Sequence, residues 1–341
     1  MSTQARGCRM RVAWLSTLLT ALTVGESLAQ SVSKSVPIVG GCAELHQAVM
    51  AQIANGRLNE AELAVSAALG SGRDHEQNSC AGLILSDLAV FMSVSGRSAE
   101  AERLAERALL ILEKTYSQNN LELLRPLQTL AASRIEQGKT AKAREAFKRI
   151  QAIRIQRSED GALVHGIAAA LLHAEGNLAE AETEYLASLR AWEDAGLGET
   201  ADAGAVLNGL GVVYIHEQRL TEARQALDRA LAIFSHAKEA GPSDRIKVLH
   251  CLGAVHARQG DWREAEQDFH DALAIADQEP WVDPVALRSL LTNYAYVLRR
   301  NHHGREARSM EARAATMHLD PALSTTIDVA DLLPKGKSPK K

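Results

Sequence analysis

Twelve histidines and four cysteines are the side chains of this sequence most able to carry metal or nucleophilic chemistry. His302 and His303 are adjacent, so their side chains diverge on a helix or in a loop. His250 and His256 are six residues apart, a spacing that does not place both on one helix face. No histidine pair therefore has the spacing of metal ligands, and we expect neither a metal site nor a cofactor.

Motifs with a known catalytic mechanism are missing from the sequence as well. It contains no His-Glu-x-x-His, no paired Cys-x-x-Cys, no phosphate-binding glycine loop and no nucleophile elbow. We therefore expect no catalytic residues, and the interpretation has to come from the elements that position the remaining polar side chains.

A short motif with one glycine, one glutamate and one alanine recurs along the chain. Its clearest copy is Gly260-Asp261-Trp262-Arg263-Glu264-Ala265-Glu266. With the alanine as the register mark, the intervals between successive copies are 40, 42, 38, 42, 42 and 42 residues. The register alanines are Ala61, Ala101, Ala143, Ala181, Ala223, Ala265 and Ala307. A fixed period in this range indicates a solenoid of stacked repeats.

Each part of the motif has a physical role in a helix–turn–helix unit. The glycine closes one helix because it tolerates a positive φ, and the glutamate favours the N-terminal end of the next helix. Gln218 and His302 replace the glycine in two copies. The alanine is small because two helix backbones cross there, and a second small residue follows seven positions later on the same face, except at Ile150.

Composition supports a folded helical chain and argues against general nucleic-acid binding. The 341 residues are 46% hydrophobic and 4% aromatic, and the formal net charge is −4. This chain is too apolar for disorder, and it lacks the strong basic surface that nucleic-acid binding requires. We expect no nucleic-acid partner.

The first 29 residues have the pattern of an export signal. Arg6, Arg9 and Arg11 precede an apolar run from Val12 to Val24, and Ser27-Leu28-Ala29 supplies small residues for cleavage after Ala29. The alternative is an uncleaved membrane anchor, although 13 apolar residues are short for a span of about 20. The prediction is an exported protein, periplasmic or extracellular, with no membrane span after cleavage.

The repeats resemble the tetratricopeptide repeat. The pattern Leu-Gly-x-x-Tyr at 210–214, the Glu-Ala pair and the later alanine carry the resemblance, which covers roughly residues 42–318. The period near 42 looks like the kinesin-light-chain-type subclass. The resemblance implies an all-α, right-handed α-solenoid of about seven helix–turn–helix repeats, after a linker at residues 30–41 and before a flexible tail at residues 319–341 that contains proline and lysine.

In such a solenoid the first helix of each repeat lines the concave groove, which implies a set of partner-binding residues. The predicted groove residues are Asn208, His216, Lys247, His250, Arg258, Asn293, Tyr296, Arg299 and Arg300. Asparagine amides can hold the backbone of an extended peptide, and arginines can hold carboxylates. The alternative is an ordinary solvated helix face.

Two cysteines also acquire a role from this arrangement. Cys42 and Cys80 lie near the starts of the first helices of two neighbouring repeats, and those helices run parallel in such a stack. In an oxidising compartment they could form a disulfide, while the alternative is two small apolar residues between helices.

The resulting prediction is a non-catalytic exported scaffold that binds a peptide or protein segment in its concave groove. Two alternatives remain open: an accessory or regulatory subunit of an exported enzyme, and a structural protein that associates with itself. The sequence does not identify the partner.

Overall fold

The structure is a computed structural model that describes residues 42–54, 57–71, 75–153, 158–237, 240–279 and 282–317. Within these ranges the chain forms fourteen α-helices, one short 3-10 helix (η4, Leu121–Leu123) and no strand. The predicted export signal, linker and tail lie outside the described residues.

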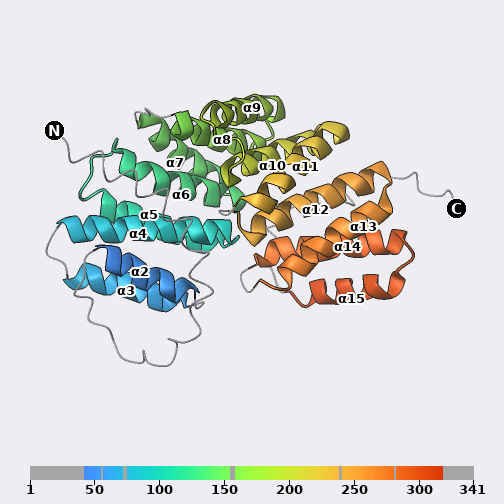
Figure 1. Ribbon diagram of the computed structural model, residues 1–341, viewed down its shortest axis with the longest axis horizontal. Coiled ribbons are helices and arrows are strands. Elements are labelled where there is room, and N and C mark those ends of the chain that lie inside the picture. Colours follow the sequence, from blue (N-terminus) through green and yellow to red (C-terminus); the bar gives the residue numbers. More distant parts are fainter. Residues whose placement is uncertain are drawn as a thin grey trace.

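Consecutive helices pack in seven pairs, one for each predicted repeat (Figure 1). The first helices, called A helices, are α2 (Cys42–Ala54), α4 (His75–Val94), α6 (Leu124–Glu136), α8 (Ser158–Ala174), α10 (Ala201–His216), α12 (Pro242–Gln259) and α14 (Pro284–Arg300). The second helices, called B helices, are α3 (Leu58–Ser71), α5 (Ser98–Leu112), α7 (Thr140–Ala152), α9 (Leu178–Asp194), α11 (Leu220–His236), α13 (Trp262–Ala276) and α15 (Gly304–Ala315). The predicted all-α solenoid of seven repeats is confirmed.

The turn between the A and B helices has the same backbone geometry in six repeats. The glycine position has a positive φ of 77° at Gly96 and 87° at Gly260, and the next N–H donates to a carbonyl five residues earlier, as in Arg97 to Met92 at 2.8 Å. This is a Schellman-type helix end, which favours glycine. Gln218 and His302 adopt the same conformation with φ of 66°. The turn therefore keeps its shape even where glycine is absent.

The register alanines lie where the sequence places two crossing helix backbones. All seven, from Ala61 to Ala307, have 0% exposure. The second small position is also buried in the repeats where it is described, and Ser188 there donates its hydroxyl to the Ala162 carbonyl at 2.7 Å. Overpacking at such closely packed positions is destabilising, so a small side chain is favoured there, with Ile150 as the exception.

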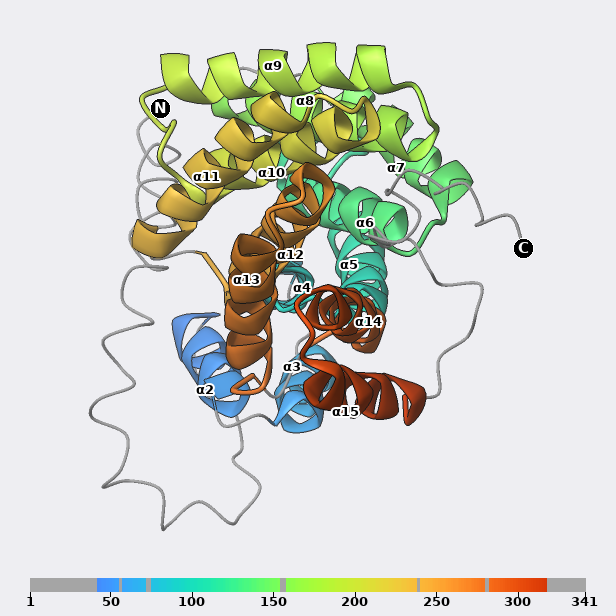
Figure 2. The ribbon, with the colours of Figure 1, turned by 90° about the vertical axis from the view of Figure 1, so that its right-hand side faces the viewer.

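The stack curves with its A helices on the inside. Neighbouring A helices contact one another directly, as α4 contacts α6 and α10 contacts α12, whereas each B helix from α3 to α13 packs against the A helices on both sides of it. Seen from one end, α8–α11 lie across the top, while the first pair and the last pair both lie at the bottom (Figure 2). This path makes the A helices the concave layer.

None of the described helices combines the length and hydropathy needed to cross a bilayer.

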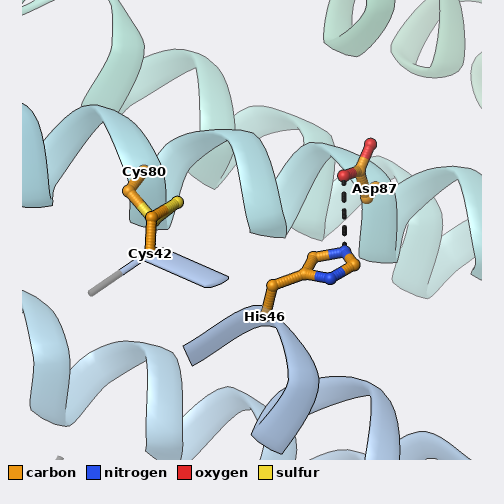
Figure 3. Close-up of a disulfide and its surroundings, with 4 residues drawn as sticks. All are labelled: Cys42, His46, Cys80 and Asp87. Atoms are coloured by element: carbon orange, nitrogen blue, oxygen red, sulfur yellow. Dashed lines mark ion pairs between the residues drawn. A yellow bond between two sulfur atoms is a disulfide. The ribbon is translucent and has the colours of Figure 1, made fainter. Parts of the chain in front are cut away.

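Cys42 and Cys80 form a disulfide in the structure (Figure 3). It joins the first residue of α2 to α4 across a Cα–Cα distance of 5.7 Å, with a sequence separation of 38 residues. Close to it, His46 Nε2 of α2 lies 3.8 Å from the Asp87 carboxylate of α4. The first repeat packs on one neighbour alone, so the disulfide fixes an element that has few other restraints. Cys251 is free and buried.

Replacing both cysteines with serine should loosen the first repeat. Closing a loop of this length is worth about 3–4 kcal/mol by loop entropy, so we expect faster amide exchange throughout α2 and α3. Hydrogen-exchange mass spectrometry of the Cys42→Ser/Cys80→Ser variant measures this. Reductant added to that variant is the control and should change nothing further. Unchanged protection of α2 and α3 would contradict a stabilising disulfide.

Candidate partner-binding groove

The nine predicted groove residues all lie on the last three A helices. Asn208 and His216 belong to α10, Lys247, His250 and Arg258 to α12, and the remaining four to α14. Because these helices form the concave layer, the fold brings the residues onto one side of the solenoid. Their individual contacts differ, and they divide into three groups.

A row of basic side chains crosses α8, α10 and α12. The rings of His173 and His216 lie with centroids 5.3 Å apart, and Arg258 Nη1 donates to the Ile215 carbonyl at 3.0 Å, next to His216. Burial and the neighbouring His216 lower the pKa of His173 to about 4, and burial together with Arg258 lowers the pKa of His216. No carboxylate of the described residues forms an ion pair with this row, so both imidazoles are neutral at pH 7.

His250 and Asn293 form a second group between α12 and α14. The Asn293 amide nitrogen lies 2.7 Å from His250 Nε2, and Asn293 is 1% exposed. The His250 ring also lies against Phe269, with centroids 5.7 Å apart. Burial lowers the pKa of His250 to about 4, so a neutral imidazole accepts the amide hydrogen bond. These two side chains hold neighbouring A helices together.

The third group consists of cationic side chains that are engaged within the chain. Arg299 donates from Nε and Nη2 to the Glu311 carboxylate of α15, both at 2.7 Å. The Arg300 guanidinium lies 4.6 Å from the centroid of the Trp262 ring, and Tyr296 contacts the same ring at 6.3 Å. Of the two predicted groove arginines, Arg299 therefore forms an ion pair within the chain and Arg300 forms a cation–π contact.

Lys247 is engaged as well, by a residue far away in the sequence. Its ammonium lies 2.6 Å from Glu136 at the end of α6, and the Ser98 hydroxyl also donates to Glu136. The Glu136 carboxylate raises the pKa of Lys247. Burial opposes ionisation of Glu136, but Lys247 outweighs it and lowers the pKa of that carboxyl. This contact reduces the positive charge that the sequence predicts for the groove.

A further row of polar residues recurs 15 positions before the register alanine, and we call it the inner row. In five of the seven repeats it consists of His46, Ser86, Gln128, Asn208 and His250, whereas Gly166 and the exposed Thr292 hold this position in the fourth and seventh repeats. The hydroxyl oxygen of Ser86, the amide nitrogen of Gln128 and the amide oxygen of Asn208 are buried and have no hydrogen-bond partner among the described residues. A buried polar atom without a partner is costly, so three such atoms in equivalent positions require an explanation.

Two residues on B helices that hold predicted groove residues were missed by reasoning from the sequence. Trp262 receives Arg300, and Glu311 neutralises Arg299. Trp262 belongs to the clearest copy of the motif, but the motif does not predict that its ring contacts Arg300. Glu311 lies on a B helix, and its register does not predict that it reaches α14. Among the described residues, no group of three histidine, cysteine or acidic side chains is placed to hold a metal.

Comparison with known proteins gives consistent matches. A family model described as Tetratricopeptide repeat matches residues 81–156 and 162–236, and a second model with the same description matches residues 246–276. No curated protein matches the sequence.

Several solved structures have a similar arrangement of helices. The Cut9–Hcn1 hetero-tetramer of APC/C has a TM-score of 0.57 and 12% identity, over 94% of this chain and 52% of that chain. BtubC (BKLC) from P. vanneervenii has a TM-score of 0.49 and 23% identity, over 69% of this chain and 94% of that chain. Pseudomonas aeruginosa pilF has a TM-score of 0.43 and 16% identity, over 72% of this chain and 93% of that chain. The likeness to Cut9–Hcn1 concerns the fold alone.

The partly buried imidazoles of His173 and His250 should make the protein less stable in mild acid. His173 and His250 have a pKa of about 4 when folded, against 6.5 for the ordinary side chain. Between these values the unfolded chain binds more protons, so the free energy of unfolding should fall as the pH drops from 7 towards 4. Urea denaturation of His173→Gln/His250→Gln should show a flatter dependence on pH. The exposed His270→Gln variant is the control, and an unchanged slope in the double variant would contradict the assignment.

Proposed function

Because the chain belongs to the tetratricopeptide repeat family, we propose that it is a protein–protein interaction scaffold that binds a peptide or protein segment along its A helices. A concave solenoid surface built from successive repeats offers an extended binding site. The proposal requires no chemistry from the chain itself.

The inner row carries this proposal. Ser86, Gln128 and Asn208 present buried polar atoms at the same register in three repeats, without partners among the described residues. An extended peptide supplies N–H and C=O groups at regular intervals, and such groups can pair with amide and hydroxyl side chains that donate and accept. Gln128 and Asn208 are only half-buried, so their amides can turn towards a bound segment, which would then satisfy both, whereas Ser86 is almost fully buried.

The basic row adds a preference for a negatively charged group. Arg258 uses one donor for the Ile215 carbonyl, and its other guanidinium N–H groups can reach a carboxylate. His216 follows Ile215 directly, so its ring lies close to this guanidinium. We therefore propose that the segment carries an acidic group near the ends of α10 and α12. Arg299, Arg300 and Lys247 are engaged within the chain and contribute less to this preference.

We also propose that the protein is exported. The pattern of residues 1–29 motivates this, and the Cys42–Cys80 disulfide supports it because disulfides persist in oxidising compartments. An exported scaffold would meet its partner outside the cytosol.

Capture of a partner tests the binding site. The mature chain, residues 30–341, is immobilised and exposed to the exported fraction of the cells that make it. We expect the Asn208→Ala/His216→Ala variant to lose about tenfold in affinity or more for the captured protein, a typical cost for two central contacts. The matched control is Arg224→Ala/Gln225→Ala, two exposed positions on α11 of the same repeat. Equal capture by both variants would place the binding site elsewhere.

The start of the mature chain tests export. We expect mass spectrometry of the exported fraction to show a chain that begins at Gln30, because small residues at 27 and 29 permit cleavage. Ala29→Leu should block processing, whereas Ser33→Leu, beyond the cleavage site, should not. An unprocessed wild-type chain confined to the cytosol would refute the proposal.

A further inference from the structure

Two parts of the solenoid that are far apart in sequence meet at a contact that we call the seam. One side consists of Val94, Gly96 and Glu136, from the α4–α5 turn and the end of α6. The other consists of Gly241, Ser243 and Lys247, from the start of α12. The end of α4 lies at the start of α12 and α14 in Figure 1. The ion pair between Glu136 and Lys247 is 2.6 Å long and joins residues 111 positions apart.

This contact departs from the usual construction of a solenoid. Stability in a repeat protein comes from interactions between neighbouring repeats. Ion pairs such as Arg149 to Glu113, 36 positions apart, follow that rule. The seam instead joins the second and third repeats to the sixth, so stacking of neighbours does not by itself require it.

The glycines at the seam provide space for the two sides to approach. A β-carbon on Gly241 would lie 2.7 Å from Val94 Cγ1 and 3.2 Å from the Val94 carbonyl oxygen. Gly241 has φ of −84°, a value that any residue adopts, so its backbone conformation does not require glycine. A β-carbon on Gly96 would lie 3.1 Å from the Ser243 hydroxyl. The absence of a side chain at Gly241 is explained by contact across the seam.

The seam is small and polar, so its two sides can come apart. Its ion pair is partly exposed, with side-chain exposures of 39% for Lys247 and 35% for Glu136. Partly exposed ion pairs contribute little and weaken with salt. Asp244 and Asp283 also lie near Lys247 and hold its charge in place. A contact of this kind can open without exposing a large apolar surface.

The packing also shows where the solenoid can bend when the seam opens. The buried core of the first three repeats ends at Ile153, and the next buried cluster begins at Ala162. The side chains of α8 that pack on the first cluster, Val164 and Ile167, are only partly buried. A cavity of about 310 Å³ lies between α7 and α8. This junction is also the one with the shortest interval between register alanines.

We propose that the seam is a reversible latch that holds the solenoid closed, and that its opening widens the concave groove for a partner. The second half of this statement rests on the proposed function, whereas the first half concerns the free protein alone. The regulation is therefore mechanical: a partner that binds the open form competes with the Glu136–Lys247 contact.

Two independent changes test the latch in the full-length free protein. Glu136→Gln and Lys247→Met remove the ion pair, and Gly241→Val forces the sides apart. We expect amide exchange of residues 94–98 and 241–247 to rise about two- to fivefold in the charge variants. It should rise on the order of tenfold in Gly241→Val. Small-angle scattering should show a larger radius of gyration in each, and in the wild type at high salt.

Matched controls separate opening from general destabilisation. Glu113→Gln removes an ion pair between neighbouring repeats, and Gly304→Val adds a side chain at the start of α15, where the nearest heavy atom is a flexible arginine nitrogen 3.9 Å away. Neither should change exchange at the seam. The combination Glu136→Gln/Lys247→Met should equal the single variants, because both remove one interaction.

The latch is overturned if the seam variants leave amide exchange and the radius of gyration unchanged, or if the control variants change them equally. It is also overturned if the effects of Glu136→Gln and Lys247→Met add in the double variant. None of these measurements needs a partner. Loss of binding in the groove variants with an intact latch response would therefore leave this inference standing, and a failed latch would leave the scaffold proposal untouched.

Discussion

The structure depends on the close crossing of two helices at each register alanine. Ala61 to Ala307 are fully buried, so the A and B helices pack on each other at these small residues. In the six repeats where the turn is described, its left-handed residue sets the angle at which the second helix returns. Gln218 and His302 adopt this turn with positive φ, although non-glycine residues rarely do so. Packing at the crossing therefore overrides the local preference of these two residues.

Curvature follows from the same crossing. Because A helices contact one another while B helices lie outside them, each added repeat bends the stack towards the A side. Polar residues at a fixed distance from the register alanine consequently line up in the inner row. His250 and Asn293 satisfy each other between neighbouring A helices, whereas Gln128 and Asn208 keep buried atoms without partners among the described residues. The same register therefore gives a contact between A helices in one repeat and a row of polar side chains in others.

The curved stack also brings distant repeats together. The seam between the α4–α5 turn and α12 is polar and small, in contrast to the apolar contacts between neighbouring repeats. A scaffold needs a groove that a partner can enter, and a polar contact exchanges with water at little cost. The disulfide between Cys42 and Cys80 acts differently, because it fixes the terminal repeat covalently to α4.

The sequence by itself determined the helical class, the number of repeats and the buried alanines, because these follow from local period and side-chain size. It also placed all nine predicted groove residues on A helices. Their contacts were decided by the tertiary structure: Arg299 is held by Glu311, Arg300 by Trp262 and Lys247 by Glu136. Register fixes the helix face on which a side chain lies. Its partner depends on how far the stack curves, a quantity that accumulates over all the repeats and is not written in any one of them.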